Sequence, residues 1–78
     1  MKRIEISPVD SGWMLRTEAM ESVLFFKSGA SAESAAIRLA QGLADAGEEA
    51  AVEIFLRDGS LGRRFTTPPR SLPAATGA

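Results

Sequence analysis

Apolar and polar residues alternate along two segments near the start of the chain. In KRIEIS, residues 2–7, Ile4 and Ile6 fall on one side of an extended chain, which predicts a half-buried strand. The segment GWMLRT, residues 12–17, alternates in the same way, with Trp13 and Leu15 on one side. Turn-forming residues SPVDSG join the two segments, so we expect a hairpin with a loop of about five residues.

A short third strand and a helix are predicted next. The run VLFF, residues 23–26, is apolar on both sides, which is typical of a short buried strand. Helical spacing then predicts an amphipathic helix over residues 32–46. Its apolar stripe is formed by Ala32, Ala36, Leu39, Ala40 and Leu43. Because alanine dominates this stripe, we expect the helix to lie close against a sheet.

Both ends of this helix carry signals in the sequence. Ser31 is a favoured N-cap residue, and Glu33 would lie in the first turn, where the helix dipole favours a negative charge. Gly47 follows Ala46 and is the residue type expected just past a helix C-terminus. The helix should therefore begin after Ser31 and end before Gly47.

A second hairpin is predicted after the helix. The segment AVEIFLR, residues 51–57, alternates with Val52, Ile54 and Leu56 toward the core. Asp58 and Gly59 then form a strong signal for a two-residue type I′ turn, which needs positive φ at both residues. The segment LGRRF, residues 61–65, returns as the last strand.

This turn sets a register for the second hairpin. It pairs Glu53 with Arg64, which predicts a cross-strand ion pair. It also places Arg63 opposite Ile54 on the side that faces the core, where an arginine fits badly. We therefore expect the last strand to be an edge strand with a bulge at Gly62.

The elements follow the order β-β-β-α-β-β. A right-handed crossover through the helix makes the fourth strand parallel to a strand of the first group. We predict the strand order 3-2-1-4-5 in one mostly antiparallel sheet, with the helix on one face, which is an α+β fold. The domain should cover residues 1–66, and residues 67–78, rich in proline and small residues, should form a disordered tail.

A single helix covers only one face of the sheet, so the other face has no partner within the monomer. Counting alternate residues assigns to that face Met14, Arg16, Val23, Phe25, Glu53, Phe55 and Arg57. Contiguous apolar patches usually mark an interface, and the candidate interface residues are Met14, Val23, Phe25, Phe55 and Arg57. We expect this face or a sheet edge to form a homodimer or to bind another protein.

Composition narrows the chemistry that the chain can perform. Its 78 residues suffice for one domain, and it contains no cysteine and no histidine. Disulfides are therefore excluded, and zinc sites and His-dependent nucleophilic catalysis are not expected. The acidic residues match no metal-binding loop, and no phosphate-binding motif occurs. We expect no enzyme activity, metal or cofactor, and therefore no catalytic residue.

Charge and hydropathy indicate where in the cell the protein is expected to be located. The net charge of −1 provides no field that would attract nucleic acid or a membrane surface. No run approaches the roughly 20 apolar residues that span a bilayer. No apolar segment follows the basic residues Lys2 and Arg3, so we expect no export signal and a cytoplasmic location.

One alternative function comes from aromatic and basic residues on the same sheet. Phe25 and Phe55 beside arginines are similar to the stacking surfaces of single-stranded RNA binders. The arginines concerned are Arg16, Arg57, Arg63 and Arg64. No ribonucleoprotein motif is present, so nucleic-acid binding stays the alternative to an interaction module.

The assembled pattern resembles a known family. KRIEISP at the start, GW at residues 12–13, Phe26 before the helix SAESAAIRLA and RDG at residues 57–59 are similar to a family of small uncharacterised bacterial domains, domain-of-unknown-function family twenty-one eighty-eight. The resemblance covers Lys2 to Phe65 and implies no assigned activity. The element order also resembles, at the level of fold, the HicB-type antitoxins, which implies an antitoxin-like regulatory role within the alternative.

Overall fold

The alternating segments form the strands of one sheet, and the alanine-rich segment forms the helix that covers it. The computed structural model describes residues 1–18 and 20–69, and within them the order β-β-β-α-β-β is confirmed. The elements are β1 (Lys2–Val9), β2 (Gly12–Thr17), β3 (Leu24–Phe26), α1 (Gly29–Asp45), β4 (Ala50–Phe55) and β5 (Leu61–Thr67). This is the predicted α+β fold.

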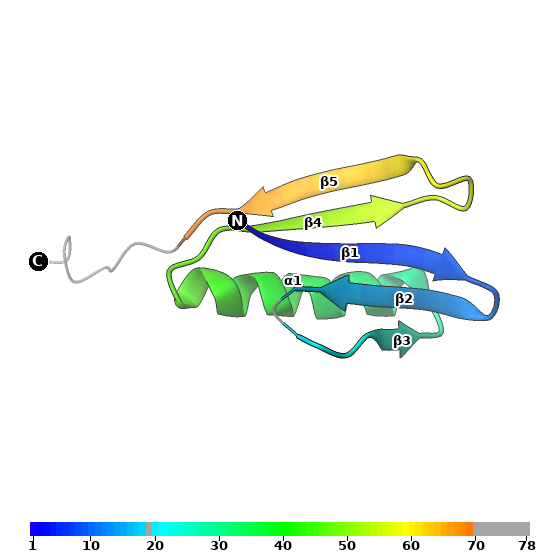
Figure 1. Cartoon of the computed structure of the whole chain (residues 1–78), viewed down its shortest axis with the longest axis horizontal. Helices are drawn as coiled ribbons and strands as arrows, with labels where there is room; N and C mark the ends of the chain where they lie inside the picture. Colours follow the sequence, from blue (N-terminus) through cyan, green and yellow to red (C-terminus); the bar gives the residue numbers. More distant parts are fainter. Residues whose placement is uncertain (19, 70–78) are drawn as a thin grey trace, which may run out of the picture.

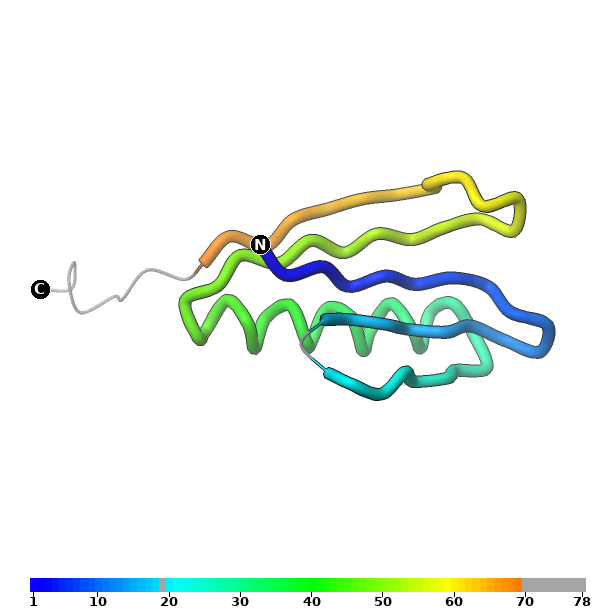
Figure 2. The backbone as a smooth tube through the Cα atoms, in the orientation of Figure 1, coloured from blue at the N-terminus to red at the C-terminus, as the bar shows by residue number. Residues whose placement is uncertain are grey.

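The sheet has the predicted strand order, β3-β2-β1-β4-β5. β1 and β4 are parallel, because α1 carries the chain between them, and the other neighbours are antiparallel. The helix lies on one face of the sheet (Figure 1). The β1–β2 and β4–β5 turns lie at the same end of the molecule, away from the N-terminus (Figure 2).

The core lies between the three central strands and α1. Its largest fully buried side chains are Ile4, Ile6, Leu15 and Val52. Each contributes roughly 1.5–3 kcal/mol by leaving water. The helix adds alanines at every fourth position, and all are buried: Ala32, Ala36, Ala40 and Ala44. These small side chains allow the helix to lie close to the sheet, as predicted.

The helix begins earlier than its sequence predicts. Ser28, not Ser31, is the N-cap residue, because its Oγ accepts a hydrogen bond from the backbone N–H of Ser31 at 3.1 Å. The helix then starts at Gly29, so Glu33 lies beyond the first turn. The predicted cap and the first-turn position of Glu33 are therefore wrong.

The end of the helix agrees with the prediction. Gly47 has a φ of 88°, and its N–H donates to Ala44 O at 3.0 Å. The next N–H, that of Glu48, donates to Leu43 O at 2.9 Å. This pair of bonds is a Schellman motif, and it satisfies two carbonyl groups that the end of the helix leaves open.

The first hairpin is tighter than predicted. β1 continues to Val9, which pairs with Gly12, so only Asp10 and Ser11 form the turn. The expected loop of about five residues is therefore wrong. Pro8 can join the strand because β1 pairs with β4 only as far as Ile6, which leaves the proline nitrogen facing no strand on that side.

The tip of the β4–β5 hairpin also differs from the prediction. The N–H of Leu56 donates to Ser60 O at 2.8 Å, and the N–H of Gly59 donates to Leu56 O at 2.9 Å. Gly59 has a φ of 88°, whereas Asp58 has a negative φ. The tip is therefore a three-residue loop, residues 57–59, and the two-residue type I′ turn is wrong.

The predicted bulge at Gly62 compensates for the longer turn. Phe55 pairs with Leu61, and Ile54 pairs with Arg63, so Gly62 is the additional residue in β5. From the Ile54–Arg63 pair to the Ala50–Thr67 pair, the register is the predicted one. The additional turn residue shifts the register by one position, and the bulge shifts it back.

Several predicted element ends differ from the structure. The fourth strand was expected to include Leu56 and Arg57, but β4 ends at Phe55, and Leu56 is 50% exposed. Val23 was assigned to the third strand but precedes β3, which begins at Leu24. Thr67, assigned to the tail, is the last residue of β5. Most of the predicted tail, residues 70–78, lies outside the described residues.

Candidate interaction surface

The open face of the sheet, opposite α1, carries three of the predicted interface residues in a row. Met14 pairs with Ser7 across β1 and β2, and with Phe25 across β2 and β3. Phe55 ends β4 and lies beside Ser7, one residue beyond the last β1–β4 pair. We call Phe55, Met14 and Phe25 the apolar row. Phe25 is 66% exposed, whereas the other two are half-buried.

A row of ion pairs crosses the same face next to the apolar row. Arg16 Nη2 donates to Glu5 Oε1 at 2.9 Å, and Arg64 Nε donates to Glu53 Oε2 at 3.1 Å. Arg3 Nε lies 4.0 Å from the other carboxylate oxygen of Glu53. The predicted Glu53–Arg64 ion pair is confirmed. The centre of the open face is therefore charged, with both carboxylates paired to arginines, and the apolar surface is confined to one side of it.

The remaining two predicted interface residues lie beside the apolar row. Val23 is 38% exposed and lines a depression together with Arg16 at the β3 side of the face. Arg57 is exposed in the β4–β5 turn and lines a second depression with Ser7 and Phe55. The structure thus brings Val23 to the β3 edge and Arg57 to the opposite end of the row.

The two edges of the sheet differ in how they are protected. β5 carries the bulge at Gly62 and the exposed Arg63 and Arg64, features that discourage pairing with another strand. β3 carries no charge, and its protection is its length of three residues. In the part of the chain that the structure describes, no strand lies beyond β3, whose outer side is open (Figure 1).

Arg63, which fitted the sequence register badly, lies on the helix side of the sheet. Its Nη2 donates to Glu33 Oε2 of α1, and its guanidinium lies 5.3 Å from the ring centre of Phe65. This pair borders a hollow of about 310 Å³ lined by apolar side chains, among them Trp13 and Leu56. Helix periodicity alone could not show that Glu33 would meet β5.

The described residues include no group of three or more acidic side chains placed to hold a metal ion. Asp58 is a carboxyl with a perturbed pKa, which two hydrogen bonds from Ser60 lower: one from its hydroxyl and one from its backbone N–H. Asp58 is exposed at the hairpin tip, so these bonds order the turn.

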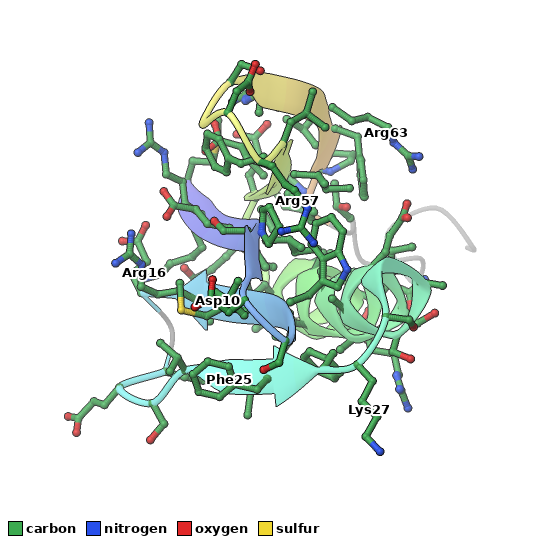
Figure 3. All side chains as sticks on the ribbon, turned by 90° about the vertical axis from the view of Figure 1, so that its right-hand side faces the viewer. Asp10, Arg16, Phe25, Lys27, Arg57 and Arg63 are labelled. Atoms are coloured by element: carbon green, nitrogen blue, oxygen red, sulfur yellow. The ribbon has the colours of Figure 1, made fainter. Side chains whose placement is uncertain are left out.

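Two charged residues that the sequence analysis did not single out flank the β3 edge. Glu21 and Lys27 are both exposed, and within residues 1–18 and 20–69 neither forms an ion pair. Lys27 extends from the end of β3 away from the rest of the molecule (Figure 3). Their signal in the sequence is the opposite charge on the two sides of VLFF.

The chain was compared with known proteins. No family model matches it, and no curated protein or solved structure is significantly similar to it. The resemblances to the uncharacterised bacterial family and to HicB-type antitoxins therefore stay predictions. None of the described helices has the length and apolar character needed to cross a membrane.

Proposed function

We propose that this protein is a non-enzymatic interaction module that associates with a second copy of itself through the β3 side of its sheet. Phe25 carries the proposal, because it is 66% exposed at the centre of an uncharged edge strand. Met14, its neighbour on β2, extends the same apolar surface inward, and Phe55 lies on the far side of Ser7. Contiguous apolar surface that contains aromatic side chains is typical of the core of a protein interface.

The charged centre of the open face favours association at the edge over stacking of two faces. Stacking would bury Glu5, Glu53 and their arginine partners, and removing such ions from water costs several kcal/mol each. If the two stacked copies were related by a two-fold axis parallel to the strands, through the middle of the ion-pair row, Arg16 of one copy would also lie over Arg64 of the other.

The nucleic-acid alternative has weaker support. Most of the arginines expected to contact phosphates already bind carboxylates, in the pairs Arg16–Glu5, Arg63–Glu33 and Arg64–Glu53. Binding a phosphate backbone would compete with these pairs, and the net charge of −1 adds no attraction.

Sedimentation velocity over about 10 to 500 µM chain tests the proposal, because a short edge interface belongs to the weak, reversible class. We expect the wild-type chain to shift toward a dimer as its concentration rises, and Phe25→Glu to stay monomeric. Leu61→Glu is the matched control, since Leu61 is 48% exposed on the opposite edge strand. A wild-type chain that stays monomeric throughout contradicts the proposal.

A further inference from the structure

We infer that β3 of one copy pairs antiparallel with β3 of a second copy, with Leu24 opposite its own counterpart. This geometry rests on the self-association proposed above and specifies how it occurs. It would join two five-stranded sheets into one continuous sheet, with both helices on the same face. The outer backbone groups of β3, which meet no strand among the described residues, would supply the hydrogen bonds.

The pleat of the strand restricts the possible registers. Residues directly opposite each other in an antiparallel pair point to the same side of the sheet. Leu24 and Phe26 pack against the core under α1, so Phe25 points to the open face. With both helices on one face, Phe25 can stand opposite Phe25 of the other copy, or opposite a residue two positions away, such as Val23 or Lys27.

The charges that flank β3 distinguish between these registers. With Leu24 opposite Leu24, Val23 of each copy faces Phe25 of the other, and Glu21, in the bend before β3, lies nearest Lys27, in the bend after β3 of the other copy. With Phe25 opposite Phe25, Val23 faces Lys27 and no charge is directly paired. The first register therefore covers exposed apolar residues with apolar ones and gives each unpaired charge an opposite partner.

The side chains concerned are accessible for this pairing. Glu21 and Val23 line the same depression as Arg16, which places them on the open-face side of β3. Lys27 extends from the end of β3 past the outer edge of the sheet, the side on which a neighbouring strand would lie (Figure 3). Because these ion pairs would be exposed at the rim, they should select the register more than they strengthen the dimer.

Cysteine cross-linking tests the register directly, because the chain contains no cysteine of its own. Glu21→Cys/Lys27→Cys should give a disulfide-linked dimer under mild oxidation, seen on a non-reducing gel. Within one chain the extended residues of β3 separate the two thiols. Each single variant should stay unlinked, because equal positions on the two copies lie at opposite ends of the paired strands and are separated by at least the three residues of β3, roughly 10 Å, beyond the roughly 7 Å that a disulfide spans.

A second pair of cysteines detects the alternative register, in which Phe25 faces Phe25. Val23→Cys/Lys27→Cys places its thiols opposite each other only when Phe25 faces Phe25. Cross-linking of this variant in place of Glu21→Cys/Lys27→Cys overturns the inferred register.

Charge reversal gives a second, independent test in solution. Either Glu21→Lys or Lys27→Glu should weaken the dimer by roughly three- to thirty-fold at low salt, because two exposed ion pairs per dimer become repulsive. The combined Glu21→Lys/Lys27→Glu variant should restore wild-type association. Arg38→Glu, an exposed change on α1, is the control and should have no effect.

The outcomes separate the two proposals. If the wild-type chain does not dimerise, the proposed function itself fails. If it dimerises but neither cross-links at positions 21 and 27 nor responds to charge reversal, self-association stands and only the β3 register fails.

Discussion

At the scale of single residues, Gly12 is the glycine, among those that the structure describes, where an added side chain has the least room. A Cβ there would lie 2.3 Å from the carbonyl oxygen of Phe26, a contact that requires the backbone of β3 to move. We expect Gly12→Ala to lower the free energy of unfolding by about 2–4 kcal/mol, measured by urea denaturation.

The matched control for this substitution is Gly42→Ala in α1. A Cβ at Gly42 would meet nothing within 4 Å, and alanine is favoured over glycine inside a helix. This variant should gain about 0.5–1 kcal/mol. If the two substitutions changed the free energy of unfolding equally, the close approach of Gly12 to the Phe26 carbonyl would not be what excludes a side chain at position 12.

Asp58 gives a prediction for pH. The hydroxyl and then the backbone N–H of Ser60 lower its pKa below the usual value of 3.8. A lowered pKa in the folded state means that the contribution to stability is complete above 3.8 and is lost as the pH falls through the lower, folded value. NMR titration should place the Asp58 midpoint below 3.8 in the wild-type chain.

Ser60→Ala is the variant that tests the cause. It removes the hydroxyl, whose bond to Asp58 Oδ1 measures 2.6 Å, and should raise the Asp58 pKa toward its usual value. An unchanged midpoint in this variant would assign the shift to the backbone alone.

At the scale of elements, the alanine stripe determines how closely α1 approaches the sheet. Ala36 is fully buried in this stripe, and a larger side chain would push the helix away from the strands. Ala36→Leu should cost about 1–3 kcal/mol of unfolding free energy, measured by thermal or urea denaturation. Ala30→Leu, an exposed position of the same helix, should stay near the wild-type value.

The start of this helix shows where local sequence signals were insufficient. Ser28 and Ser31 are equally good N-cap residues, so residue type alone cannot choose between them. In the fold, Trp13 lies against Gly29, with a ring carbon 3.2 Å from where a Cβ would stand. We attribute the earlier start to this contact between distant residues, which local propensity does not contain.

At the scale of the whole molecule, the sequence predicted the sheet order and part of the open face, but the predicted face omitted Arg3, Glu5 and Arg64. Alternation showed that Met14 and Phe25 share a face with Glu53, because side chains alternate along a strand. It could not show that Glu5 would stand beside Glu53, since that pairing depends on the parallel register set by the α1 crossover. The apolar row and the ion-pair row became distinct only in the assembled sheet.

The hairpin between β4 and β5 has a tip whose length can change without altering the pairing of the two strands. Eight residues, 55–62, join Ile54 to Arg63, and that number suits either a three-residue turn with a bulge or a two-residue turn without one. The sheet below Gly62 has the same pairing in both cases. The tip is therefore a separable segment, and a short peptide inserted between Asp58 and Gly59 should leave the Glu53–Arg64 pairing in place.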